Sequence, residues 1–135
     1  MNRQWNDANR TTPLLLVAER NAQAANSVVR TLQQWEVRIA VASTVREANE
    51  MIGDLLFIGA SIDGLVTDFL LVDGFGGSIV RELRNSFPET PAAILVENGE
   101  ANADVWRHLR GIEVLSRSPQ WDELSSWVKD LQVTA

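Results

Sequence analysis

The chain has 135 residues, enough for one compact domain, and 45% of them are apolar. Its net charge of −6 argues against a nucleic-acid-binding surface, because such surfaces need clustered Lys and Arg. With no cysteine and a single histidine, His108, the chain offers little for disulfides, zinc sites or a Ser/His/Asp triad. No apolar run approaches the roughly 20 residues that span a bilayer, and the polar N-terminus lacks a secretory signal. We therefore expect a cytoplasmic protein that does not bind membranes.

Short apolar runs alternate along the chain with stretches of helical spacing. Residues 1–12 are polar and are expected to form a flexible tail, followed by one domain over residues 13–133. Continuous apolar runs are typical of strands buried on both faces, and they predict strands at 13–18, 37–42, 64–69, 91–97 and 112–116. The remaining stretches predict helices at 21–35, 44–56, 74–87, 101–110 and 118–133.

Two of these helices have recognisable starts. Thr44 and Glu47 have capping-box spacing, while Ser118 and Pro119 suit the N-cap and first position of the last helix. Five strand–helix units with apolar strands predict an α/β domain, in which a parallel sheet is covered by helices on both faces.

Polar side chains follow three of the predicted strands. They are Glu19 and Arg20 after the first, Asp68 at the end of the third, and Glu97 and Asn98 after the fourth. Reactive groups of such sheets collect at the carboxyl ends of the strands, so we expect these side chains to meet.

The glycine-rich stretch after Asp68 contains Gly74, Gly76 and Gly77. Its spacing does not match a nucleotide-binding P-loop, and no lysine follows it. We interpret it as the connection between the third strand and the third helix.

This pattern resembles the response-regulator receiver domain, the CheY-like fold, over residues 13–133. The resemblance depends on the order of elements, Asp68 at the end of the third strand, Gly76 eight residues later, Pro91 opening the fourth strand and Pro119 before the last helix. It implies a flavodoxin-like (βα)5 three-layer sandwich with sheet order 2-1-3-4-5. It also implies a role in two-component signalling rather than enzymatic turnover.

Members of that family carry an acidic pair after the first strand and a phospho-accepting Asp after the third. A Thr or Ser follows their fourth strand, and a Lys follows the fifth. The acids hold Mg²⁺, which neutralises the phosphoryl oxygens during in-line attack by the Asp. The hydroxyl and the Lys then bind the phosphoryl group and couple it to neighbouring loops.

Carried over to this chain, the phospho-acceptor position is Asp68. The acidic pair falls on Glu19 and Arg20, or in another register on Ala18 and Glu19, so one acid is lost in either case. The resemblance implies no organic cofactor. It leaves Glu19 and Asp68 as ligands for weakly bound Mg²⁺, with a backbone carbonyl near Leu70.

The other switch positions also depart from the family. The hydroxyl position falls on Val96, and the Lys position falls on Ser118, or on Arg117 if one residue is deleted. Arg20 would repel Mg²⁺, and its guanidinium could pair with Asp68 instead.

We therefore expect an atypical receiver, or pseudo-receiver, that acts by protein–protein contact without phosphorylation. One alternative is a working phospho-acceptor that uses Asp68 with Mg²⁺. Another is a flavin mononucleotide carrier on the same fold, which the sequence "AERNAQ" disfavours because it is not a Ser/Thr-rich phosphate loop.

Trp106 and Trp127 are candidate interface residues, because exposed tryptophans are favoured at binding hot spots. The family's helix register implies an outward-leaning place for Trp127. Receivers commonly dimerise through helix 4, strand 5 and helix 5, so the resemblance implies a homodimer through that face. Many also precede an output domain. The alternative is that both rings cover the domain's own core.

Overall fold

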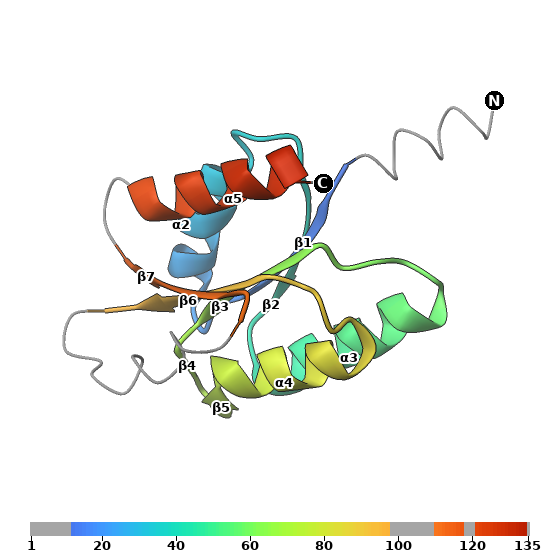
Figure 1. The fold of residues 1–135 in the computed structure, drawn as a ribbon. Coiled ribbons are helices and arrows are strands. Elements are labelled where there is room, and N and C mark those ends of the chain that lie inside the picture. Colours follow the sequence, from blue (N-terminus) through green and yellow to red (C-terminus); the bar gives the residue numbers. More distant parts are fainter. Residues whose placement is uncertain (1–11, 98–109, 118–120, 135) are drawn as a thin grey trace.

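A five-stranded parallel sheet forms the middle layer of the molecule (Figure 1). The structure is a computed structural model that describes residues 12–97, 110–117 and 121–134. The sheet order is β2-β1-β3-β6-β7, which is the predicted order 2-1-3-4-5. The strands are β1 (Leu14–Ala18), β2 (Arg38–Ala42), β3 (Gly64–Asp68), β6 (Ala92–Val96) and β7 (Ile112–Ser116).

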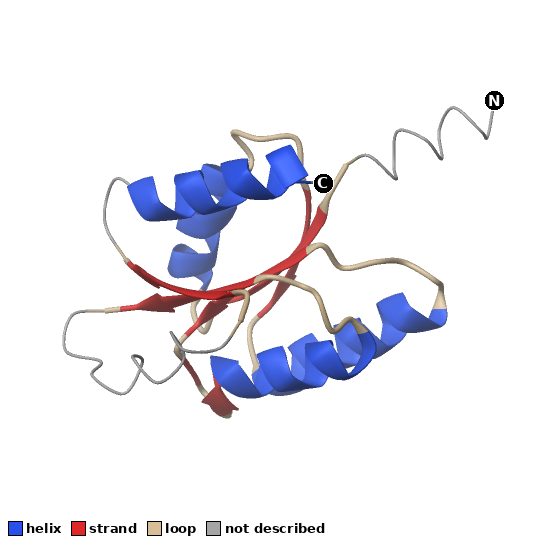
Figure 2. Ribbon diagram, in the orientation of Figure 1, coloured by secondary structure: helices blue, strands red, loops and turns tan. Residues whose placement is uncertain are grey.

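Helices cover both faces of this sheet (Figure 2). Helices α2 (Ala22–Leu32) and α5 (Asp122–Thr134) lie on one face, and α3 (Val45–Phe57) and α4 (Gly76–Ser86) lie on the other. Each face has its own apolar cluster, because successive side chains of a strand point to opposite faces. No helix in the described part of the chain is long and apolar enough to cross a membrane.

The centre of the sheet has the burial expected of parallel strands. Every residue of β1 and β3 is buried, whereas β2 lies at an edge and is largely exposed or half-buried. The continuous apolar run of β1 fits its central position in the sheet, because helices cover both faces of the sheet there.

The hydrogen bonds at the start of α3 confirm the predicted capping role of Thr44 and Glu47, and Asp73 caps the same turn. Thr44 Oγ1 accepts a hydrogen bond from the Glu47 N–H at 3.0 Å, and Glu47 Oε1 accepts one from the Ser43 N–H at 2.6 Å. The Asp73 carboxylate accepts two further hydrogen bonds, from the backbone N–H groups of Val45 and Arg46. These backbone hydrogen bonds lower the pKa of Asp73. The connection after β3 is thereby tied to the first turn of α3.

The glycine-rich stretch is a connection, as predicted, but it has structure of its own. Leu70–Leu71 (β4) and Gly74–Phe75 (β5) pair as a short antiparallel ladder. Helix α4 consequently begins at Gly76, two residues later than predicted.

Two other helix boundaries differ from the prediction. Helix α5 begins at Asp122 rather than near Ser118, and α2 ends at Leu32, before Trp35. Trp35 is half-buried and packs against the cluster on its own face. The predicted tail and the predicted helix over 101–110 lie mostly outside the described residues, as does Ser118.

Gly76 allows the closest approach of backbone to backbone in this connection. A Cβ at Gly76 would lie 2.2 Å from the backbone oxygen of Asp68 and 2.6 Å from Thr67 Oγ1. Because backbone has little room to move, we expect Gly76→Ala to lower the free energy of unfolding by about 1–3 kcal/mol. Urea denaturation measures this.

The matched control is Gly53→Ala, in the exposed middle of α3. A Cβ at Gly53 would have no atom within 4 Å, so we expect this variant to be stabilised by about 0.5–1 kcal/mol through better helix propensity. Equal behaviour of the two variants would contradict the close approach at Gly76.

Candidate functional site

The predicted meeting of polar groups occurs at the carboxyl edge of the sheet. Glu19 directly follows β1, Asp68 ends β3, and Arg117 directly follows β7. Backbone hydrogen bonds fix these positions: the Glu19 N–H donates to Ala42 O, and the Arg117 N–H donates to Val96 O. The sheet register therefore places three charged side chains at one edge.

Arg117 is the centre of this cluster. Its Nη2 donates to both carboxylate oxygens of Glu19, each at 2.7 Å, and lies 3.3 Å from Asp68 Oδ1. The Glu19 side chain is fully buried, and the side chains of Arg117 and Asp68 are nearly so. One guanidinium thus holds both carboxylates, which makes this a buried charge network rather than a surface ion pair.

The Arg20–Asp68 ion pair expected from the sequence is present but weaker. Arg20 Nε lies 3.8 Å from Asp68 Oδ2, and the Arg20 side chain is 46% exposed. Solvent screens such a pair. Arg20 therefore covers the outer side of Asp68, while Arg117 takes the inner side.

Burial and ion pairing act in opposite directions on the pKa values of Glu19 and Arg117. Burial raises the pKa of Glu19 to about 7, although the Arg117 guanidinium acts in the opposite direction. Burial also acts to lower the pKa of Arg117, but the carboxylates of Glu19 and Asp68 outweigh it, and the pKa is raised. Arg117 is consequently a permanent cation in this site.

The residues present do not fit Mg²⁺. A hard cation needs several free oxygen ligands, but both oxygens of Glu19 accept hydrogen bonds from Arg117, and Asp68 lies between two guanidinium groups. No group of three or more His, Cys, Asp or Glu that could hold a metal exists among the described residues. The two carboxylates are neutralised by arginine instead.

The other switch positions give mixed outcomes. Of the two candidates for the Lys position, Arg117 has a side chain that reaches Glu19 and Asp68, whereas Ser118 lies outside the described residues. Val96 ends β6 beside Ser116 and brings no hydroxyl to this edge. The predictions from sequence do not include the pairing of Arg117 with both carboxylates. An arginine expected at the same sheet edge as two acidic residues could have indicated this pairing.

The tryptophans also differ from expectation. Trp127 is 8% exposed and belongs to the apolar cluster, so the outward position inferred for it is wrong. Trp106 lies outside the described residues, and the interface roles of both stay predictions. Trp121, just before α5, has φ 54°, and its ring centroid lies 5.9 Å from Arg117 Cζ. This cation–π contact joins the charge network to the start of α5.

Comparisons with known proteins give structural likeness only. No protein-family model and no curated protein matches this sequence. A response regulator receiver protein from Sinorhizobium medicae WSM419 is 22% identical, with a TM-score of 0.76, over 90% of this chain and 95% of that chain. A response regulator receiver domain protein from Clostridium thermocellum is 20% identical, with a TM-score of 0.77 and the same coverage.

A structure of an adenylate cyclase from Rhodopirellula baltica is also similar, at 13% identity and a TM-score of 0.77, over 90% of this chain and 88% of that one. At these identities the likeness concerns the arrangement of the elements. The chain has the fold of response-regulator receiver domains.

Proposed function

We propose that this protein is a pseudo-receiver: a receiver-fold signalling domain that acts by protein–protein contact and does not depend on phosphorylation of Asp68. The observation that carries the proposal is the contact of Arg117 with both Glu19 and Asp68. In a phospho-accepting receiver these carboxylates would have to be available to an ion and to an attacked phosphoryl group.

The charge network supports one fixed conformation of the site. Breaking it would leave a buried Glu19 without a partner, which is costly. A phosphoryl group that arrived at Asp68 would find no hydroxyl at Val96, and the two carboxylates that would have to hold a metal ion are already paired with arginine. The two-state response of a receiver therefore lacks its usual driving contacts.

The test is an amide NMR titration of the full chain with Mg²⁺ and then with beryllofluoride, a mimic of an aspartyl phosphate. We expect the signals of Glu19, Asp68 and Arg117 to stay unchanged at millimolar Mg²⁺ and excess beryllofluoride. Shifts that start at Asp68 and spread to residues 112–117 would overturn the proposal in favour of a working phospho-acceptor.

A restored variant shows whether the substituted residues are the cause. Arg20→Asp, Val96→Thr and Arg117→Lys together supply the groups that the resemblance implies. We expect this triple variant to respond to Mg²⁺ and beryllofluoride, with Val96→Thr alone as the unresponsive control. A folded triple variant that stays silent would mean that the arginines do not close the site.

A further inference from the structure

A cavity of about 380 Å³ lies at the amino ends of the strands, between the loop that precedes β3 and the loop that follows α4. We call it the amino-end cavity. The charge network lies at the other end of the sheet, since its residues follow the carboxyl ends of the strands. The volume is near the lower limit of small-ligand sites, which suits one large side chain. The wall combines four apolar residues with two carboxylates: Ile62, Phe87, Pro88 and Pro91, with Asp63 and Glu89.

The chain enters the described fold beside this cavity. Asp63, in the cavity wall, accepts a hydrogen bond from the Leu14 N–H through Oδ2 at 2.8 Å, and its own N–H donates to Leu14 O at 2.8 Å. From β2, on the other side of β1, Arg38 donates to Thr12 O through Nε and Nη2. Figure 1 shows the start of β1 and the two loops of the cavity at one end of the sheet. Residues 1–11 therefore continue from a point that is hydrogen-bonded to the cavity wall.

Apolar side chains are exposed at the same end of the molecule. Helix α3 ends there with Leu56 and Phe57, and Ile58 follows it; the exposed fractions of these residues are 48%, 91% and 73%. Neighbouring exposed apolar side chains of this size usually mark a contact surface. Because they are exposed with respect to the described residues, a cover for this end has to come from another part of the chain or from another molecule.

Residues 1–11 have the composition to fill the cavity. Trp5 is their only aromatic residue, and they are basic, because they contain two arginines and one acidic residue. The wall of the cavity offers apolar contacts to an indole ring, and its carboxylates attract a basic segment and can accept the indole N–H. An extended chain covers about 3.3 Å per residue, so Trp5 can reach about 30 Å from Leu14. The cavity is well within that reach.

We propose that residues 1–11 fold back onto the domain and place the Trp5 ring in the amino-end cavity. The ring packs against Phe87 and Pro88, and the arginines of the segment lie near Glu89. The tether favours this occupant over a separate partner protein, because a short linker gives an effective concentration that is roughly millimolar. Composition alone predicts a flexible tail, and the cavity is the reason to expect a docked one. The inference goes beyond the proposed function and does not depend on it.

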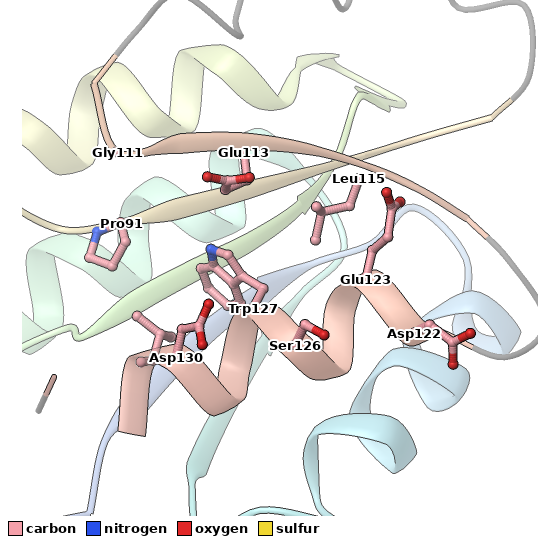
Figure 3. A pocket seen from close by; sticks show the side chains of 10 residues that line it. Pro91, Gly111, Glu113, Leu115, Asp122, Glu123, Ser126, Trp127 and Asp130 are labelled. Atoms are coloured by element: carbon pink, nitrogen blue, oxygen red, sulfur yellow. The ribbon is translucent and has the colours of Figure 1, made fainter. Parts of the chain in front are cut away.

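A larger cavity nearby is the main alternative site. It has a volume of about 570 Å³, lies between β7 and α5, and shares Pro91 with the amino-end cavity (Figure 3). Four of its lining residues are acidic, so it would also attract a basic segment. However, β3 and β6 lie between its strand β7 and β1 in the sheet. Asp63 of the amino-end cavity instead contacts β1 directly, so proximity favours the amino-end cavity.

The test uses a spin label, because the chain has no cysteine of its own. Asn2→Cys in the full chain carries the label, and its unpaired electron broadens the amide NMR signals of nearby residues. We expect the strongest broadening at residues 62–63 and 86–90, and none at residues 44–47, which begin α3 at the other end of the sheet. Adding Trp5→Ala keeps the label and the tether but removes the ring. This change should lower the docking equilibrium about tenfold or more and remove most of the broadening.

Paired variants of the labelled chain test the charges of the cavity. Glu89→Gln should weaken docking about two- to fivefold, as expected for one exposed charge pair. Glu82→Gln removes the same charge from an exposed position on α4 that does not line the cavity, and it should leave docking unchanged. Equal effects of the two variants, equal broadening with and without Trp5, or broadening centred on Glu113 of the larger cavity would overturn the proposal.

A mixed sample distinguishes the chain's own segment from that of a second copy. It contains isotope-labelled chain without the spin label and spin-labelled chain without the isotope, so that only contacts between copies broaden the observed signals. We expect no broadening at residues 62–63 and 86–90 in this sample. Broadening there would mean that the segment of one copy fills the cavity of another, and it would overturn docking within one chain.

Discussion

Replacement of Arg117 by alanine is expected to lower the free energy of unfolding by about 3 kcal/mol. The reason is the fully buried Glu19 carboxylate, whose two oxygens both accept hydrogen bonds from Arg117. Removing one partner of a buried pair leaves an uncompensated charge, which typically costs about 3–5 kcal/mol. Protonation of Glu19 limits the loss to the lower end, because its pKa is already raised. Urea denaturation at neutral pH measures the effect.

Two further variants test the origin of that loss. Glu19→Met combined with Arg117→Met should recover most of the stability, because two apolar side chains of similar size leave no buried charge. Arg20→Ala should cost less than about 1 kcal/mol, since its contact with Asp68 is long and exposed to solvent. A double variant as unstable as Arg117→Ala would show that packing by Arg117, rather than its charge, stabilises the fold.

Much of the fold follows from the sequence because its strongest signals are local. The continuous apolar run of β1 and the capping residues of α3 depend on neighbours in the chain, and both predictions are confirmed. The hairpin of β4 and β5 was missed because its two-residue strands are too short to produce an alternating pattern.

The site was less predictable because it depends on register between distant segments. Counting along the chain leaves Arg117 and Ser118 as alternatives for the Lys position. The pairing of β6 with β7 places Arg117 at the carboxyl edge of the sheet, where its side chain reaches Glu19. The spacing of Leu124, Trp127, Val128 and Leu131 is that of one helix face. That spacing indicates a buried Trp127 more reliably than the family register that placed it outward.

Raising the pH from about 4.5 to above 7 is expected to destabilise the protein through Glu19. The pKa of Glu19 is raised from its ordinary 4.5 to about 7 in the folded protein, chiefly by burial. Between these values the folded state binds more protons than the unfolded state, so stability falls as the pH rises. The difference between the two pKa values corresponds to about 3 kcal/mol, which is lost in full above pH 7.

Glu19→Gln isolates this contribution, because the amide is neutral at every pH and about the same size. The free energy of unfolding of this variant should vary less between pH 4.5 and 7 than that of the wild type, in a urea series at each pH. Asp73 contributes in the other direction: its lowered pKa gives stability that is lost as the pH falls below its ordinary 3.8. The two windows are separate, so the Glu19 effect can be measured alone. If the wild type and Glu19→Gln changed in parallel from pH 4.5 to 7, Glu19 would be ionised throughout, and attraction to Arg117 rather than burial would control its charge.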